Sequence, residues 1–407
     1  MFDQMKLSAW TSGIRNRVNL PLRVELWNGE QVDLSDEQPR VKIRVPGPGG
    51  LRYLLSPSLD SLGEAYVEGA LEIEGSSADM IQIGNALAET TGKPPRTSRV
   101  ASAMLNLVSP HTKEKDAESI RYHYDVSNEF YQQFLDPAMV YSCAYFENGD
   151  EDLATAQQKK IDHILTKIDV RPGQTLLDIG CGWGALVIRA AQKFGARCVG
   201  VTLSERQYEL ARERVAQAGL QDQIEIRLQD YRDVTGGFDR ITSVGMFEHV
   251  GRKNLPGYFK KVHDLLADDG IAMNHGITSS DADSGETALG GGEFIDRYVF
   301  PDGELPHISL ALESMQRGGL EAVDVESLRR HYAHTLDIWA ENFEAHAEEA
   351  RKLVDDEKFR IWRVYLAGCA YAFENDDVSI YQVVCRRAGR SAKTLPWSRR
   401  YMYEKPL

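Results

Sequence analysis

The sequence predicts an α/β fold, in which a doubly wound, mostly parallel sheet carries a helical cap and follows a small α+β domain. Two patterns support this prediction. From about residue 170 onward, short apolar runs alternate with amphipathic helical stretches, which is the order of a parallel sheet with helices on both faces. Before that, residues 20–75 alternate apolar and polar side chains as half-buried strands do, with Asn28-Gly29 and the glycines of 47–50 supplying turns.

The elements follow from these patterns in order. Helices are expected near 78–91 and over "LSERQYELARERVAQAG", which ends in a glycine typical of a helix C-terminus. Residues from about 331 to 374 have an all-helical pattern, so we expect them to cap the site. The strands of the larger sheet are expected at 174–180, 197–202, 224–230, 238–245 and 270–277, followed by two closing strands, "LEAVDVESL" and "VSIYQVVCRR". The predicted ranges are 1–92 for an N-terminal domain, 93–116 for a linker, 117–388 for the main domain and 389–407 for a tail.

The composition argues against several classes of protein. The chain has 407 residues and a net charge of −14, so nucleic acid is not expected as the main partner. No apolar run approaches the roughly 18 residues of a membrane span, and the first residues lack the apolar core of a signal peptide. The five cysteines are odd in number and contain no CxxC spacing, so neither a disulfide framework nor a metal site is expected. A reduced, cytoplasmic setting fits best.

The last 22 residues differ from the rest because they are basic and contain a single acid, Glu404. Trp397, Tyr401 and Tyr403 lie among the basic residues, which are Arg386, Arg387, Arg390, Lys393, Arg399, Arg400 and Lys405. Basic residues with interfacial aromatic rings suit an anionic membrane surface. The same composition also describes a solvated tail that packs on its own protein, and both interpretations stay open.

One glycine-rich motif indicates a cofactor. "LLDIGCGWGAL" places Asp178, Gly180, Gly182 and Gly184 where the first strand of the larger sheet turns into a helix. Glycines there let the backbone approach a ligand closely, and a helix N-terminus favours negative or polar groups. A dinucleotide site uses a related turn, but with the spacing GxGxxG and with an acid near the end of the second strand. Here the spacing is GxGxG and the second strand runs into "VTLSERQ", which favours S-adenosylmethionine (SAM) over NAD.

The end of the third strand adds two candidates for the same site. "RLQDYRD" supplies Asp230 and Tyr231 there. An acid at that place can hold an adenine amine, and a ring can stack on the base. The alternative is an ordinary solvated strand end.

Several further motifs occur together in the order of one known family. The runs "YHYDVSNEFYQQFLDP", "VYSCAYF", "LDIGCGWG", "VTLSERQ", "MFEHVG" and "DRYVFPDGELP" closely resemble the cyclopropane-fatty-acyl-phospholipid synthases, whose relatives are the mycolic-acid methyltransferases. The resemblance covers about residues 118–388 and implies a class I SAM-methyltransferase sheet. "LGEAYVEGALEIEG" resembles that family's N-terminal lipid-binding domain more loosely.

The resemblance implies a reaction. A methylene would pass from SAM to the cis double bond of unsaturated acyl chains in membrane phospholipids. Methyl transfer to an alkene leaves a carbocation, and a base must then remove a proton so that the cyclopropane ring can close. In the family this base is a bound bicarbonate ion, whose cage falls here on Cys143, Glu248, His275, Ile277 and Tyr332. Cys143 and Ile277 are expected to act through backbone groups, and each of the five, taken singly, also fits a core or capping position.

Resemblance also assigns the cofactor contacts. Tyr141 and Ser142, in "VYSCAYF", are expected in a loop that closes over SAM, and Gln207 would otherwise be an exposed helix residue. Cys369 matches a cysteine proposed for the family's active site, although an apolar helix there favours an inert, structural thiol. Phe294, Tyr298 and Phe300 are candidate walls of the acyl site or ordinary core residues. The full set of expected SAM contacts is Tyr141, Ser142, Asp178, Gly180, Gly182, Thr202, Gln207, Asp230 and Tyr231.

Other functions stay open at this point. The same first step followed by a hydride shift would give a methylene- or methyl-branched chain in place of a ring. A non-catalytic lipid carrier with a relic cofactor fold, or a dehydrogenase, is a more distant alternative. The expected partners are unsaturated phospholipid acyl chains at the inner face of the membrane, with the protein peripherally attached as a homodimer that doubles weak contacts.

Overall fold

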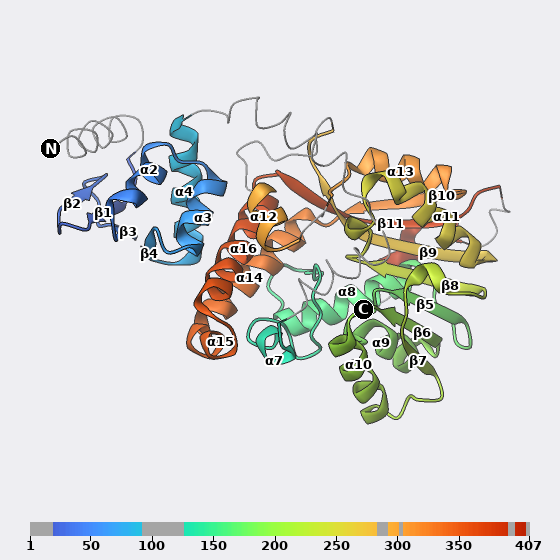
Figure 1. Cartoon of the computed structure of the whole chain (residues 1–407). Helices are drawn as coiled ribbons and strands as arrows, with labels where there is room; N and C mark the ends of the chain where they lie inside the picture. Colours follow the sequence, from blue (N-terminus) through green and yellow to red (C-terminus); the bar gives the residue numbers. More distant parts are fainter. Residues whose placement is uncertain (1–18, 92–125, 283–291, 301–303, 390–394, 404–407) are drawn as a thin grey trace. The chain divides into compact units, whose positions relative to one another are not determined.

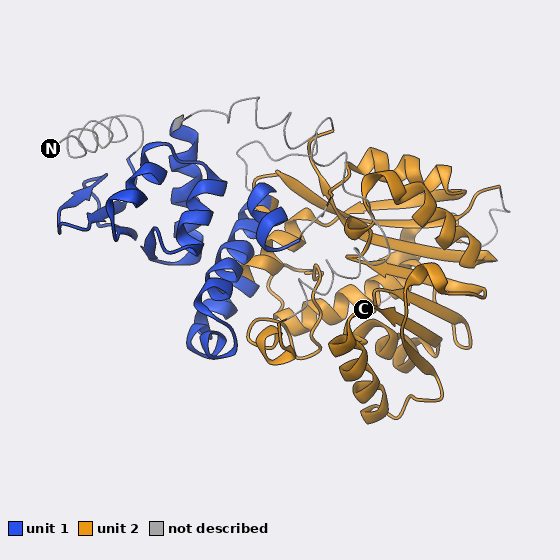
Figure 2. Cartoon of the chain, in the orientation of Figure 1, with its two compact units in different colours: residues 1–109, 286–301, 339–372 blue, residues 110–285, 302–338, 373–407 orange. Residues whose placement is uncertain are grey.

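The computed structural model of the chain describes residues 19–91, 126–282, 292–300, 304–389 and 395–403 (Figure 1). The chain divides into two compact units that are interleaved in sequence, as Figure 2 shows. The smaller unit takes residues 1–109, 286–301 and 339–372, and the larger unit takes 110–285, 302–338 and 373–407. The predicted linker at 93–116 lies outside the described residues.

The larger unit is built on a seven-stranded sheet with the strand order β10-β11-β9-β8-β5-β6-β7. Strands β5 to β9 pair in parallel, whereas β11 runs antiparallel to both of its neighbours. Every strand predicted for this sheet is therefore present, and the sheet is mostly parallel as predicted. The strands are β5 Thr175–Ile179, β6 Arg197–Thr202, β7 Ile224–Leu228, β8 Phe238–Val244, β9 Leu266–Ser279, β10 Leu320–Ser327 and β11 Val378–Arg387.

Helices cover both faces of this sheet. Alternate side chains of a strand point to opposite faces, so Leu176 and Leu177 of β5 enter two separate hydrophobic cores. The first core lies under α8 Leu153–Lys167, α9 Ala185–Phe194 and α10 Glu205–Gln217. The second core lies under α11 Leu255–Leu265 and α13 Ile308–Arg317. This three-layer arrangement confirms the doubly wound fold (Figure 1).

Local sequence signals account for where these helices begin and end. Helix α8 begins after Asp152, whose side chain accepts a hydrogen bond from the backbone N–H of Thr155. Helix α10 begins after Ser204, which caps it in the same way through the N–H of Gln207. It ends at Gln217, and Gly219 follows with a φ of 66°, the left-handed backbone expected for a helix stop.

The smaller unit has a four-stranded sheet in the order β2-β1-β3-β4 and its own core, which includes Val24, Ile43, Leu54 and Leu87. Alternate residues of β3 are buried and exposed, as the period-two pattern predicts. The elements from the N-terminal segment are β1 Leu22–Leu26, β2 Gln31–Asp33, β3 Val41–Val45, α2 Leu51–Leu55, α3 Leu59–Val67, β4 Glu72–Glu74 and α4 Ser77–Thr91.

Two later segments complete the smaller unit, and here the predicted domain ranges differ from the observed units. The segments contain α12 Gly292–Tyr298, α15 Ala347–Leu353, the C-terminal part of α14 Arg329–Ala345 from residue 339 onward, and most of α16 Asp356–Glu374. Arg363 of α16 donates hydrogen bonds to the hydroxyl oxygen of Tyr66 (3.1 Å) and the carbonyl oxygen of Gly75 (2.5 Å), and pairs with Glu344 (2.5 Å). Residues 339–372, predicted as a cap of the main domain, are therefore tied to the N-terminal segment by contacts that local patterning does not reveal. Across the described residues, no helix has both the length and the apolar character needed to cross a bilayer.

Candidate active site

A pocket of the larger unit lies at the carboxyl ends of its parallel strands, where ligands bind in open α/β sheets. Strand order changes direction there, because β5 lies between β6 and β8. The loops after β5, β6, β7 and β8 all contribute, together with helix α8 and the segment before it. The residues that line the pocket are 139–142, 160–161, 178–183, 185–186, 201–203, 207, 229, 231, 244–246 and 249.

The glycine motif forms one wall of this pocket. Gly180 and Gly182 have φ values of 80° and 53°, so both adopt backbone that side chains disfavour. A Cβ on Gly180 would lie 3.2 Å from Cγ of Met246, another residue of the wall. Asp178 beneath the loop accepts a hydrogen bond from the Thr242 hydroxyl (2.7 Å), and burial raises the pKa of this carboxyl to about 6.

The next strand ends carry the remaining predicted cofactor contacts, with one exception. Thr202 and Gln207 both line the pocket and hydrogen-bond to each other (2.8 Å), so Gln207 is buried and not an exposed helix residue. Tyr231 also lines the pocket. Asp230 does not line it, because its carboxylate turns to the guanidinium of Arg232 at 2.6 Å. Its predicted contact with adenine stays a prediction.

The segment "VYSCAYF" is fixed in place by hydrogen bonds to buried side chains. Tyr141 and Ser142 line the pocket, and Gln157 of α8 donates to the carbonyl oxygens of Val140 (3.2 Å) and Ser142 (2.7 Å). The N–H of Phe146 donates to Nδ1 of His331 (3.0 Å). The predicted loop over the cofactor is thus observed as an anchored wall.

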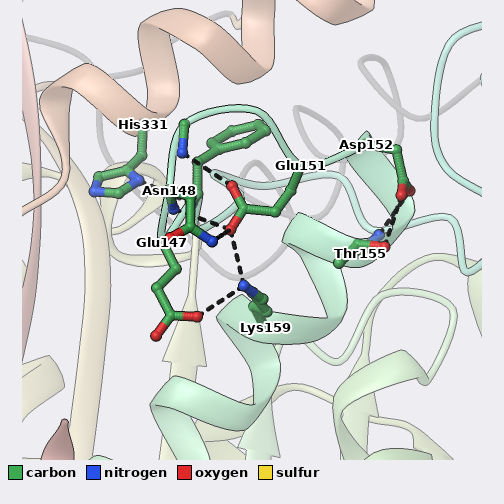
Figure 3. A network of polar contacts seen from close by, with 9 residues as sticks. Glu147, Asn148, Glu151, Asp152, Thr155, Lys159 and His331 are labelled. Atoms are coloured by element: carbon green, nitrogen blue, oxygen red, sulfur yellow. Dashed lines mark hydrogen bonds and ion pairs between the residues drawn. The ribbon is translucent and has the colours of Figure 1, made fainter. Parts of the chain in front are cut away.

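The chain that follows is held just as firmly (Figure 3). The Glu151 carboxylate accepts hydrogen bonds from the backbone N–H groups of Asn148 (3.0 Å) and Gly149 (3.1 Å) and from Lys159 (2.8 Å). These bonds close the turn that leads into α8. The pocket wall and the first turns of α8 therefore form one connected structure.

Glu248 and His275 are two buried side chains in segments that contact the pocket wall. Strand β9 continues beyond its last pairing with β8, at His275, so the N–H of Ile277 has no strand partner on that side and donates to Oε1 of Glu248 (2.6 Å). Gly245 of the pocket donates its N–H to the carbonyl oxygen of His275 (2.8 Å). Glu248 Oε2 and His275 Nε2 are buried and make no hydrogen bond with any of the described residues. Two polar atoms are therefore left for a ligand.

The other two predicted cage residues connect to these segments through the backbone. The carbonyl oxygen of Leu328 accepts from the N–H of Tyr332 (3.0 Å) and lies 3.8 Å from Sγ of Cys143. The N–H of Leu328 donates to the carbonyl oxygen of Ile380 (2.9 Å), which is paired with Ile277 across β11 and β9. Backbone contacts thus connect the segments that carry the five predicted residues, and their joint binding of an anion stays a prediction. Burial raises the pKa of the Cys143 thiol well above its usual range, so it is no thiolate nucleophile.

The electrostatics of Glu248 and His275 follow from burial. Loss of solvation raises the pKa of Glu248 to about 7 and lowers the pKa of His275 far enough to keep the imidazole neutral. Gln382 Nε2 lies 3.2 Å from Nδ1 of His275, and Lys167 donates to the amide oxygen of Gln382 (3.4 Å). Because the lysine fixes which way the amide points, the amide N–H donates to Nδ1 and His275 carries its own proton on Nε2.

Comparison with known proteins decides the family. Residues 111–383 match the family described as mycolic acid cyclopropane synthetase. The chain belongs to this family. It is thus a SAM-dependent methyltransferase of the cyclopropane synthase family, as the sequence motifs predicted. Residues 9–92 match a second family, described as a domain of unknown function.

Named relatives and structures show the extent of the likeness. A probable fatty acid methyltransferase of Pseudomonas putida is 46% identical over 394 residues, covering 95% of this chain and 97% of the relative. The cyclopropane-fatty-acyl-phospholipid synthase of Escherichia coli (strain K12) is 37% identical over 350 residues, covering 85% and 87%. The crystal structure of the mycolic acid cyclopropane synthase CmaA1 complexed with SAH and CTAB has a TM-score of 0.63 and 35% identity, covering 69% of this chain and 99% of that one.

Two sets of predicted residues of this methyltransferase belong to the smaller unit. They are Cys369 and the candidate walls of the acyl site, Phe294, Tyr298 and Phe300. Burial raises the pKa of the Cys369 thiol to about 12, which agrees with a structural role. Phe294 of α12 packs on α3, where a Cβ on Gly63 would lie 2.9 Å from its ring. The ring of Phe300 lies 5.9 Å from that of Tyr365. Phe294 is buried whereas Tyr298 and Phe300 are partly exposed, and an acyl contact stays a prediction for all three.

Sequence reasoning missed some residues of the cofactor pocket. Trp183, Met246 and His249 line it, and so does Lys160. The signal for Lys160 was its position on α8, where a lysine occurs next to the buried residues Ile161 and Ile164. A long charged side chain on a buried helix face needs a partner, and that requirement is visible in the sequence pattern.

Proposed function

We propose that this methyltransferase adds a one-carbon unit from SAM to the cis double bond of an unsaturated acyl chain of a membrane phospholipid and closes a cyclopropane ring. The observation that supports this proposal most directly is the burial of both Glu248 and His275 near the cofactor pocket. Each keeps one polar atom without a hydrogen-bond partner among the described residues. A reaction that makes a carbocation needs such a sheltered proton acceptor.

The pocket residues fit SAM. The glycine loop leaves room for close approach, since a Cβ on Gly180 would crowd Met246. Tyr231, Thr202 and Gln207 line the ends of β6 and β7, where polar and aromatic groups can contact a nucleoside. Bound SAM supplies the methyl group. The chain's own part is to orient that group and to keep water away from it.

The cage residues fit a small oxyanion such as bicarbonate. His275 presents its Nε2–H as a donor, and Glu248, with a pKa of about 7, can accept a proton through its remaining oxygen. Bound bicarbonate would supply the base that the ring closure needs. The Ile277 N–H holds Glu248 in position, and the neutral state of His275 leaves the cage free of a charge that would repel a cation.

The test uses purified protein, methyl-labelled SAM, bicarbonate and vesicles that contain cis-monounsaturated phospholipid. Mass spectrometry and NMR of the lipid should show a chain heavier by one CH₂ group, about 14 mass units plus the mass of the label, carrying ring protons in place of vinyl protons. A Glu248→Gln variant keeps the size of the side chain and removes the proton acceptor, so it serves as the matched control. An unchanged lipid with the wild-type protein would refute the proposal.

A second candidate has specific support. The relative from Pseudomonas putida, which matches nearly the whole chain, is described as a probable fatty acid methyltransferase. A methylene-branched chain, or a methyl-branched chain that keeps a double bond, would use the same cofactor pocket and the same proton acceptor after a hydride shift. In the experiment above it appears as new methyl or methylene resonances without ring protons.

We also propose that the enzyme acts as a homodimer bound peripherally to the inner face of the membrane. Part of the basic tail is packed on the larger unit: the Tyr401 hydroxyl donates to the Lys167 carbonyl oxygen (2.8 Å), and Arg399 pairs with Asp324 (2.6 Å). Trp397 beside them is fully exposed. If this side chain contacts lipid, Trp397→Ala should weaken sedimentation with anionic vesicles, and unchanged sedimentation would contradict it. Light scattering measures the oligomeric state.

A further inference from the structure

Lys160 is a buried ammonium group that forms no ion pair with the part of the chain that the structure describes. Its side chain is 1% exposed and lines the cofactor pocket. Its Nζ donates to the hydroxyl oxygen of Ser142 (2.6 Å), and no carboxylate of the described residues forms a salt bridge with it. Lys167, two turns further along α8, is equally buried but pairs with Asp324 (3.0 Å) and Glu326 (2.7 Å). The two lysines therefore differ in whether a carboxylate pairs with the buried charge, and a buried charge without such a partner is costly.

A buried ammonium group that lines a pocket, with no carboxylate in contact among the described residues, favours a ligand that brings a carboxylate. Chemistry narrows the ligand group, because SAM carries two positive centres, the sulfonium and the α-ammonium, and a single anionic group, the α-carboxylate. We propose that Lys160 and Ser142 bind the α-carboxylate of the methionyl part of SAM. This proposal rests on the SAM dependence of the enzyme and not on which lipid product it forms.

The arrangement of the pocket agrees with this assignment. Groups suited to a nucleoside, Thr202 and Tyr231, come from the ends of β6 and the loop after β7, on one side of β5. Lys160 and Ser142 come from α8 and the anchored segment before it. Asp178 also lines the pocket and has the opposite charge to Lys160 when ionised. An acid and a lysine in one pocket complement the ammonium and carboxylate of a free amino acid.

One helix holds both parts of the proposed carboxylate site. Gln157 binds the carbonyl oxygen of Ser142, and Lys160, about one turn later, binds its hydroxyl. Because Lys160 donates to the hydroxyl oxygen, the hydroxyl hydrogen of Ser142 is available to a ligand. The bonds that Glu151 makes in Figure 3 fix the turn between Ser142 and α8, so the site is formed before any ligand binds.

The test compares two ligands that differ only in the amino-acid part. S-adenosylhomocysteine (SAH) carries the carboxylate, whereas 5′-methylthioadenosine lacks the amino-acid group altogether. Calorimetry should show that Lys160→Met weakens SAH binding by about 10- to 100-fold, the range for a hydrogen bond to a charged group. Methylthioadenosine should bind the variant as it binds the wild type, which also shows that the pocket is folded. Lys160→Arg should restore part of the SAH affinity.

The pH dependence supplies a second readout. Burial lowers the pKa of Lys160 to about 8, so SAH affinity should fall as the pH rises above 8, while affinity for methylthioadenosine stays level. The groups that interact with Lys160 electrostatically are Cys143, Asp136, Asp178 and His275, and the imidazole of His275 stays neutral. Cys143 stays protonated in this range and Asp178, with a pKa of about 6, stays ionised, so neither produces such a change. The Lys160→Met variant corrects for titration of the ligand's own amine.

The outcomes separate the two proposals. Equal losses for both ligands, or no loss for SAH, would overturn the assignment of Lys160. Wild-type protein that binds neither ligand would instead refute the SAM dependence on which the proposal rests. A normal lipid product together with equal ligand losses would refute the Lys160 assignment alone.

Discussion

Replacing Lys160 by methionine should make the protein more stable, although it weakens SAH binding. Burial lowers the pKa of Lys160 from 10.5 to about 8, and one pKa unit corresponds to about 1.4 kcal/mol, so holding the charge costs on the order of 3 kcal/mol at pH 7. The variant also loses the hydrogen bond to Ser142, which lowers its free energy of unfolding by about 1 kcal/mol. Methionine has nearly the shape of lysine, so the net gain should be about 2 kcal/mol in the free energy of unfolding.

Urea unfolding at several pH values measures this gain. The folded pKa of Lys160 lies below the unfolded one, so between pH 8 and 10.5 the unfolded state binds more protons and the wild-type protein becomes more stable as pH rises. The advantage of the variant should therefore be full below pH 8 and shrink toward pH 10.5. A variant less stable than wild type at pH 7, or an advantage that does not change with pH, would refute the reasoning.

Lys167→Met is the matched control. It removes an equally buried lysine from the same helix but takes the ammonium group away from Asp324 and Glu326, whose remaining partners are Arg399 and His163. Breaking a buried ion pair on one side costs about 3–5 kcal/mol, so this variant should be less stable than wild type. The two lysine-to-methionine variants should change the free energy of unfolding in opposite directions. A general effect of methionine would change it in the same direction in both.

Three further results are expected. Glu248→Gln should lower kcat by about 100-fold or more and abolish the rise in kcat/KM through pH 7, since Glu248 with its pKa of about 7 accepts a proton only when ionised; an unchanged pH profile contradicts this role. Gln382→Leu should convert the single Nε2–H tautomer of His275 into a mixture, seen in ¹⁵N NMR spectra; a pure spectrum would show that the amide does not fix the tautomer. Cys369→Ala should keep activity within about threefold, because a thiol with a pKa of about 12 stays protonated; a larger loss in the methyl-transfer assay would restore it as an active-site candidate.

The strands and the glycine loop were predictable because their signals are local. Apolar runs such as that around Leu176 mark buried strands wherever they occur, and Gly180 and Gly182 need backbone angles that few other residues adopt. Side-chain choice was not predictable in the same way. The sequence allows the Asp230 side chain to face the pocket or a neighbouring cation, and only the structure shows that it pairs with Arg232.

The contacts of the predicted cage residues and the boundaries of the two units were also not predictable, because they depend on segments far apart in the sequence. Glu248 accepts a hydrogen bond from Ile277 because β9 extends beyond its last pairing with β8. That extension depends on the register of the two strands and not on either sequence motif. Residues 339–372 have a helical pattern in the sequence, but that pattern does not say which segment of the chain packs against the helices. Contacts between distant segments therefore had to come from the structure.

The interleaved units have a consequence for synthesis of the chain. Tyr66 and Gly75 leave the ribosome long before Arg363, whose guanidinium binds both of them in the finished protein. At about 5–20 residues per second, roughly 290 residues of further translation correspond to a delay of about 15–60 s. During that time the early strands have their own core but not the late helices. The smaller unit is therefore among the first parts to emerge and among the last to be completed.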